Sequence, residues 1–314
     1  MHDAPQISPE HKHVDRETVA QLPKALLHDH LDLSGATTVA EVTAAAARAA
    51  EELAADNVVY AELRVRPVAG DVDAAAVLDA VAAGFDAHIV VDARIIVTAD
   101  RDVDPVAQWA QVCVDKLGGR VVGFDLAGPE DESLAPHAET LRMLRKNYVP
   151  VTVHAGATEG MDRIREAVDH GAVRLGHGAR IFDDFQVSLE GIGTGAVSTW
   201  VRDRGLVLEL CPTQEVRAGV VDDLADHPLT LLQQMGFACT VNVGDRSVTS
   251  LTDELMRLVE TFDYGFDELF DVTVTAVNGA FCGKERREEI LATRILPAYE
   301  ELAGDFNEDV EFGL

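Results

Sequence analysis

Apolar runs and amphipathic segments alternate along almost the whole chain of 314 residues. Eight of the runs are nearly continuous apolar stretches, a pattern typical of parallel strands that are buried on both faces. Segments with helical periodicity lie between them, so the chain is predicted to repeat a strand–helix unit. The predicted strands cover Ala25–Leu27, Val58–Val65, Ile89–Val97, Val121–Leu126, Val151–Val153, Val173–Leu175, Leu206–Leu210 and Ala238–Val243.

The predicted helices follow the strands one by one, and the chain closes with a helical region. Eight strands that are each followed by a helix predict an α/β fold, a single (β/α)8 barrel of the TIM type over residues 21–314. Residues 1–20 are polar and are predicted to form a flexible tail. The predicted helices cover Val39–Ala55, Ala74–Ala83, Pro105–Leu117, Pro136–Lys146, Met161–Asp169, Val197–Arg204, Pro228–Met235, Leu251–Phe262, Phe266–Asn278 and Lys284–Glu301.

The charge composition of the chain limits the classes of partner that it is expected to bind. The chain carries 55 acidic and 26 basic residues, a formal net charge of −29. A surface with this charge repels phosphate backbones and anionic lipid, so we expect neither nucleic acid nor a membrane as a partner. No apolar run reaches the roughly 18 residues of a membrane-spanning helix, and the N-terminus has no apolar signal core. The expectation is a soluble cytoplasmic protein, whose oligomeric state the sequence leaves open.

The four cysteines are scattered without the spacing of a metal or redox motif. They are Cys113, Cys211, Cys239 and Cys282. In a reducing compartment such residues are small apolar side chains, so no disulfide framework is expected.

Two histidines at the end of the first predicted strand offer the first candidate for chemistry. His28 and His30 are two residues apart, and residues i and i+2 of a strand point to the same side. Neutral imidazole is a common metal ligand, so the pair forms half of a zinc-type site. Two ordinary surface histidines would give the same short motif.

Other strand ends strengthen the metal interpretation. In a (β/α)8 barrel the chemistry lies at the carboxyl ends of the strands. Asp125 lies at the end of the fourth predicted strand, His154 follows the fifth, and His177 follows the sixth. A single histidine there is as often a hydrogen-bonded structural residue as a ligand. Four histidines from three strands favour one metal centre.

Motifs along most of the chain resemble those of the adenosine deaminase family, specifically its actinobacterial branch. They occur in the family's order from Gln21 to Ala298. The matching segments are LPKALLHDHLD (22–32), VVYAELR (58–64), VVGFDLAGPE (121–130), VTVHAG (151–156), RLGHGARI (174–181), LVLELCPTQEVRAGVV (206–221), HPLTLL (227–232), TVNVGDR (240–246) and TSLTDE (249–254).

The resemblance implies a metal-dependent hydrolase that adds zinc-bound water to C6 of a purine nucleoside and releases ammonia. A divalent ion lowers the pKa of its bound water from about 15.7 toward about 7. One Zn²⁺ ion is therefore implied. By position, the metal ligands are His28, His30 and His154; the residue that helps activate the water is His177; and the substrate contacts are Asp32, Gly128 and Asp245.

The first departure from the family pattern removes the proton shuttle. The family has a glutamate after His-Ala-Gly, and this chain has Ala157 there. Loss of a general acid–base costs about 10²–10⁴-fold in rate. Glu159, two residues further on, is the candidate substitute base, which would require a shift of the loop.

The second departure affects the metal. The family's fourth ligand is an aspartate after the eighth strand, and this chain has Gly244 there. Three histidines can hold zinc with an open fourth position, so weaker binding is expected, not loss. A small turn could alternatively let Asp245 reach the ion.

The third departure affects the cover of the site. One helix-length stretch, Gly35–Asn57, joins the first two strands, where family members have several helices. The shortened lid predicts an open, wet pocket, and Leu33 adds bulk after Asp32. We therefore expect an adenosine deaminase-like protein with strongly reduced or lost activity. The alternatives are an active hydrolase that uses Glu159 or Asp245, and a non-catalytic partner or regulatory subunit of an intact deaminase.

Overall fold

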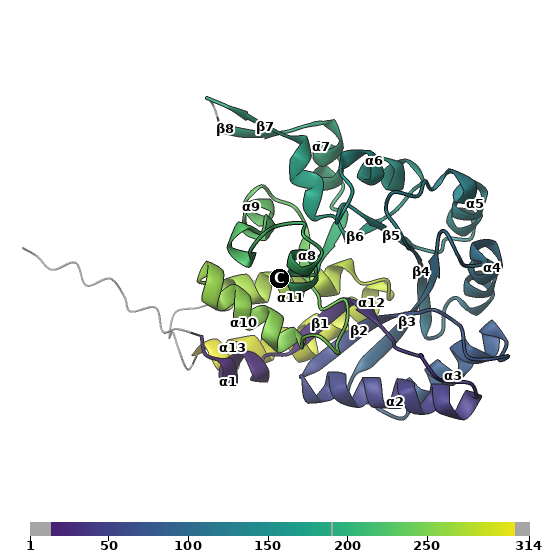
Figure 1. Ribbon diagram of the computed structural model, residues 1–314. Coiled ribbons are helices and arrows are strands. Elements are labelled where there is room, and N and C mark those ends of the chain that lie inside the picture. Colours follow the sequence, from purple (N-terminus) through teal and green to yellow (C-terminus); the bar gives the residue numbers. More distant parts are fainter. Residues whose placement is uncertain (1–13, 190, 305–314) are drawn as a thin grey trace, which may run out of the picture.

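The computed structural model describes residues 14–189 and 191–304. Eight parallel strands follow one another around a barrel, with helices on the outside (Figure 1). Each coincides with a predicted strand, so the (β/α)8 fold is confirmed. The strands are β1 (Lys24–His30), β2 (Val58–Val65), β3 (Asp92–Asp100), β4 (Val121–Ala127), β5 (Val151–Ala155), β6 (Arg174–His177), β9 (Val207–Leu210) and β10 (Cys239–Val241).

The two ends of the sheet meet just beyond β10. The backbone N–H of Gly244 donates to the carbonyl of His28 at 2.9 Å, and the N–H of His30 donates to the carbonyl of Gly244 at 3.1 Å. The side chain of Asn242 adds to this seam, because its Oδ1 accepts from the N–H groups of Leu27 and His28 at 2.9 and 3.0 Å. The seam therefore fixes the backbone of both histidines of the first strand.

The helices lie close to their predicted positions, and three have the predicted bounds. The predicted C-terminal helix over 284–301 is divided by a π-helical turn (Leu291–Ile295). The helices that match predicted ones are α2 (Val39–Ala55), α3 (Ala74–Asp86), α4 (Val106–Lys116), α5 (Ala138–Lys146), α6 (Met161–Asp169), α7 (Ala196–Asp203), α9 (Leu229–Gln234), α10 (Leu251–Phe262), α11 (Phe266–Gly279), α12 (Lys284–Ile290) and α13 (Leu296–Gly304).

Helix α2 is the only helix between β1 and β2, as the sequence predicts. A capping box starts it, since the Thr38 hydroxyl accepts from the Glu41 N–H and Glu41 returns a bond to the Thr38 N–H. Its alanine-rich face packs very closely on α3: a Cβ at Gly84 would lie 2.6 Å from the Cβ of Ala46. One tightly packed helix thus covers this side of the barrel.

Two helices and a two-stranded hairpin were not predicted. Helix α1 (Arg16–Gln21) begins at an Asp15 cap and has Val19 buried. The predicted tail therefore does not extend through 16–20, and residues 1–13 lie outside the described part. Short helix α8 (Pro212–Arg217) follows β9, and strands β7 (Phe185–Ser188) and β8 (Gly191–Thr194) form a hairpin that projects from the barrel (Figure 1).

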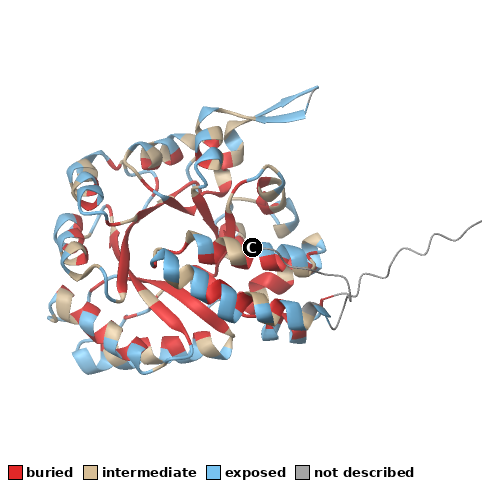
Figure 2. Cartoon of the chain, turned by 180° about the vertical axis from the view of Figure 1, so that it is seen from behind, coloured by how far each residue is buried: buried red, intermediate tan, exposed pale blue. Residues whose placement is uncertain are grey.

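Figure 2 shows the barrel strands as almost entirely buried, with exposed residues on the outer faces of the helices and on the hairpin. The four cysteines are buried and unpaired. Within residues 14–189 and 191–304, no helix is long and apolar enough to cross a membrane.

Candidate metal centre

Three of the predicted histidines converge at the carboxyl end of the barrel. His28 and His30 come from β1 and His154 from β5, and one ligand atom from each lies within 4.8 Å of the others. Nε2 of His28 is buried and has no hydrogen-bond partner, and the buried Nε2 of His154 has only an Asp125 oxygen near it, at 3.3 Å. Orphaned imidazole nitrogens facing one space are what a bound divalent cation would satisfy. The donor set therefore fits a metal ion.

Burial keeps this cluster in the form that binds metal. Burial lowers the pKa of His28 well below its usual value, and the charge of Arg64 adds to the effect. The pKa of His30 falls to about 3, mainly through burial and then through His154 and Arg64. Both imidazoles are neutral at pH 7, which leaves their nitrogen lone pairs available.

A network of buried charged side chains contacts the histidine cluster. Glu209 Oε2 lies 3.1 Å from Nδ1 of His28, and it also pairs with Arg64. Arg64 Nε lies 3.2 Å from Asp125, whose carboxylate is in turn 3.3 Å from Nε2 of His154. Such outer partners fix the orientation of ligating histidines. The sequence predicted Asp125 at this edge but not Glu209 or Arg64, although charged residues inside apolar strands were a usable signal.

His177 lies beside the cluster, with its ring centroid 5.1 Å from that of His28. Its Nδ1 is 2.9 Å from Glu215 Oε1, and the other carboxylate oxygen is 2.6 Å from Nε2 of His227. Burial lowers the pKa of His177, but the hydrogen bond and charge of Glu215 outweigh burial, so the net shift is upward. The site therefore combines imidazoles whose pKa values are lowered with one whose pKa is raised.

A cavity of about 250 Å³ adjoins His154 and His177. Ala157 and Gly128 line it, and Gly128 has a φ of +94° that favours glycine. Ala157 gives this cavity no carboxylate.

The nearest acid, Glu130, holds the loop that carries Ala157. It is 7% exposed and accepts from the backbone N–H groups of Ala157, Thr158 and Glu159 at 3.0, 3.0 and 2.8 Å. The Glu159 side chain is itself exposed and does not line the cavity. Sequence reasoning missed Glu130, whose role depends on a loop 27 residues away.

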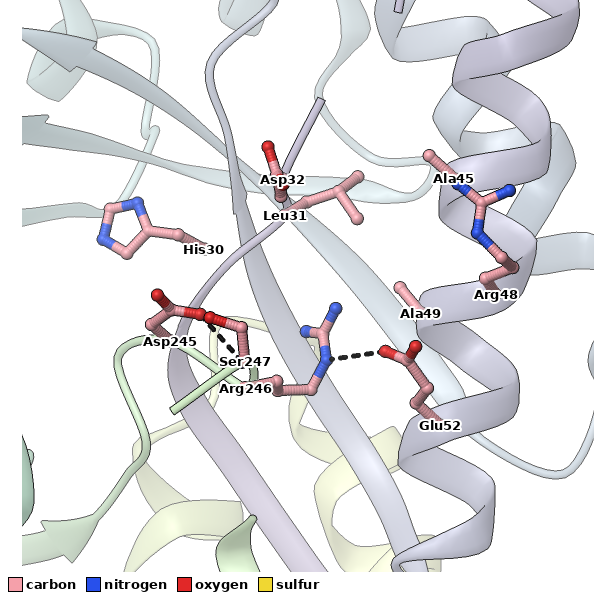
Figure 3. A pocket seen from close by; sticks show the side chains of 10 residues that line it. All are labelled: His30, Leu31, Asp32, Ala45, Arg48, Ala49, Glu52, Asp245, Arg246 and Ser247. Atoms are coloured by element: carbon pink, nitrogen blue, oxygen red, sulfur yellow. Dashed lines mark hydrogen bonds and ion pairs between the residues drawn. The ribbon is translucent and has the colours of Figure 1, made fainter. Parts of the chain in front are cut away.

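The mouth of the barrel holds the remaining predicted contacts. Figure 3 shows Asp32 and Asp245 near His30, in a pocket bounded by α2. The carboxylate of Asp32 accepts from the Ser34 N–H at 2.7 Å, and hydrogen bonds to Ser34 lower its pKa. A wider cavity of about 740 Å³ adjoins this pocket, and Leu33 is among its lining residues. The mouth beside the single helix α2 is spacious.

Comparison with known proteins agrees with this architecture. The family model described as "Adenosine deaminase" matches residues 34–295. An adenosine deaminase from Mycobacterium sp. (strain KMS) is 35% identical over 356 aligned residues, which cover 92% of this chain and 98% of the relative.

Two solved structures share the fold at low identity. An amidohydrolase from Burkholderia ambifaria with bound zinc superposes with a TM-score of 0.82 at 19% identity, over 97% of this chain and 98% of that one. The adenine deaminase of Arthrobacter aurescens gives 0.73 at 20% identity, over 90% and 99%. From the match of the family model and the identity to the mycobacterial relative, the chain belongs to the adenosine deaminase family.

Proposed function

We propose that this protein is a zinc-dependent hydrolase that removes the 6-amino group of a purine nucleoside, at a rate far below that of intact family members. The observation that carries the proposal is the place of Ala157. It lines the cavity beside His154 and His177 and offers no group that can transfer a proton.

The metal part of the proposal rests on the donor set. His28, His30 and His154 would hold the ion, because their ligand atoms converge and the buried Nε2 of His28 has no other partner. A zinc ion at this place would supply a Lewis acid and acidify bound water. In the absence of an aspartate at Gly244, we expect weaker binding than in relatives that have one.

The proton chemistry is where the site is deficient. Glu215 raises the pKa of His177, which favours a positive charge on this imidazole that could stabilise negative charge beside the cluster. Glu130 is the acid closest to Ala157, but its carboxylate accepts three backbone bonds and is committed to the loop. Removing a general acid–base from a hydrolase costs about 10²–10⁴-fold in rate.

The substrate assignment follows the remaining contacts. The purine would lie against Gly128 in the inner cavity and the sugar would lie near Asp32 at the mouth, with Asp245 on the opposite wall. The solved relatives include an adenine deaminase, so the free base belongs in the same test.

The test is a deamination assay of the zinc-loaded protein with adenosine as the substrate. The rate of inosine release is compared with that of a mycobacterial adenosine deaminase. We expect a turnover at least 100-fold below the relative. A turnover within tenfold of the relative would contradict the proposal.

A rearranged active site is the second candidate, favoured by one observation: Asp245 lines the mouth together with His30. In this version Asp245 or Glu159 supplies the carboxylate. Asp245→Ala and Glu159→Ala variants separate the two ideas. If measurable turnover survives both substitutions unchanged, this second candidate is wrong.

A further inference from the structure

Gln214 lies between the two cavities of the site and has no role in the chemistry described above. It belongs to the first turn of α8, which begins at Pro212 directly after β9. It lines the inner cavity with His154 and His177, and it also lines the outer cavity with His30 and Gly244. Its side chain therefore borders the histidine cluster.

The amide oxygen of Gln214 occupies the space that a side chain at position 244 would need. A Cβ placed on Gly244 would overlap Oε1 of Gln214 and would lie 2.9 Å from its Cδ. The backbone of Gly244 is bonded on both sides to His28 and His30. The oxygen is thus held against a backbone that itself carries two of the candidate ligands.

That oxygen is buried and accepts no hydrogen bond. An unsatisfied buried polar atom costs about 1–3 kcal/mol, so native structures rarely leave one without a purpose. In the histidine cluster, His28 Nε2 and His154 Nε2 are also buried without a hydrogen bond, and an Asp125 oxygen lies 3.3 Å from the latter. A single cation would satisfy all three.

Two neighbouring groups are poorer candidates for the same task. The Cys211 sulfur lies 3.5 Å from the point where a Gly244 Cβ would be, but its thiol donates to the carbonyl of Glu209 at 3.7 Å. Asp245 is exposed, and its carboxylate accepts from the Ser247 N–H at 2.8 Å. Of Cys211, Gln214 and Asp245, only Gln214 presents a buried oxygen that has no hydrogen-bond partner.

We propose that Gln214 supplies the fourth protein ligand of the metal centre through Oε1, in the place left open by Gly244. The inference rests on the metal centre of the proposed function. It goes further in assigning a neutral amide oxygen, contributed by α8 after β9, where a charged carboxylate after β10 was expected. A neutral donor leaves the bound ion with one more unit of positive charge than a carboxylate would.

The test measures zinc affinity by competition with a chromophoric chelator, and the visible spectrum of the Co²⁺-loaded protein, with no substrate present. Gln214→Leu keeps the size of the side chain and removes the oxygen, so we expect affinity to fall about 10–100-fold and the cobalt spectrum to change. Gln214→Glu restores an oxygen and adds charge, so it should bind at least as tightly as wild type. Gln186→Leu, on the exposed β7–β8 hairpin, is the matched control and should change neither reading.

The second part of the experiment replaces the proposed Gln214 ligand by an aspartate at position 244. Gly244→Asp alone should not tighten zinc binding, because Gln214 fills the space. Gly244→Asp combined with Gln214→Ala should bind tighter than Gln214→Ala alone. Aspartate is among the residues that tolerate the φ of +67° found at this position.

The outcomes separate the two proposals. Wild-type affinity and an unchanged cobalt spectrum in Gln214→Leu would overturn the role of Gln214 while leaving the three-histidine site intact. If Gln214→Leu fails to fold, a Gln214→Glu protein that binds zinc tenfold more weakly than wild type overturns it instead. Failure of the wild type to bind zinc overturns both proposals, whereas zinc binding that depends on Gln214 in a protein without deaminase activity supports this one alone.

Discussion

The two sides of the active-site cavity differ in the charged side chains that they carry. On the inner side, Arg64 of β2, Asp125 of β4 and Glu209 of β9 form a fully buried network beneath the histidines. On the side of β10 and the loop after β5, Gly244 and Ala157 carry no functional side chain. One side is equipped to hold a cation, and the other lacks the groups that would use it.

The difference teaches where a family site can lose function without loss of fold. Removing one partner from a buried ion pair destabilises a protein by about 3–5 kcal/mol, because a charge is left unpaired. Replacing a carboxylate at the cavity wall by alanine or glycine leaves no such charge. The residues that support the candidate metal ligands are therefore tied to stability, while positions 157 and 244 are not.

The largest effect is expected at the histidine cluster. His154→Ala removes one of three imidazoles, so the zinc content should fall from about one ion per chain to near zero, as measured by atomic absorption after gel filtration. His88→Ala, at the end of α3 and outside the cavity, is the control. Full zinc content in His154→Ala would mean that the ion binds elsewhere.

Adding the missing carboxylate tests the deficient side directly. Ala157→Glu should raise the rate of adenosine deamination by about 10²–10⁴-fold, since it supplies a general acid–base next to His177. Ala157→Gln has the same shape but cannot transfer a proton, and it should stay as slow as wild type. Equal rates for the two zinc-loaded variants would break the comparison between the two sides.

Disruption of the buried charged network should lower the stability of the protein. Arg64→Met leaves Asp125 and Glu209 without their shared cation, so the free energy of unfolding should fall by about 3–5 kcal/mol in urea denaturation. Arg66→Met, two residues along the chain, removes a partly exposed pair with Asp104 and should cost less than about 1 kcal/mol. Similar losses for the two variants would show that the network is not what stabilises this side.

The smallest effect concerns His177 and depends on pH. Glu215→Gln removes the carboxylate that raises the pKa of His177, so this pKa should fall, as measured by NMR of the ring. In wild type the pKa of Glu215 is lowered, so its stabilisation is present above the unfolded value of 4.5 and is lost as the pH falls. The stabilisation that comes from the raised pKa of His177 is present below pH 6.5. It is lost as the pH rises through the pKa of His177 in the folded state. The stability difference between wild type and Glu215→Gln should therefore be greatest between pH 4.5 and 6.5, and a flat difference would contradict this account.

The sequence predicts most of the fold because the barrel strands are apolar on both faces and the amphipathic helices have clear ends. It misses the β7–β8 hairpin, whose residues are mostly exposed and contribute no hydrophobic pattern. It also misses α1 and α8, which have only six residues each. Short or exposed elements are defined by tertiary contacts and not by periodicity.

The residues of the candidate site also divide into those that the sequence predicts and those that it does not. His28, His30, His154 and His177 were predicted because strand ends of a barrel meet at one edge. Gln214 could not be predicted, because its oxygen fills a space that is empty only when position 244, thirty residues later, is glycine. Glu130 was missed for a similar reason, since its partners are the backbone groups of a distant loop.

The seam that closes the barrel couples the candidate metal centre to opening of the barrel wall. Gly244 closes the wall through the backbone of His28 and His30, so any opening of the wall there frees the backbone that positions two candidate ligands. A cation held by both imidazoles binds the closed state only and shifts the opening equilibrium by mass action. Amide hydrogen exchange at His30 and Gly244 should then slow with zinc and quicken with a chelator, making the strand closure itself a reporter of occupancy.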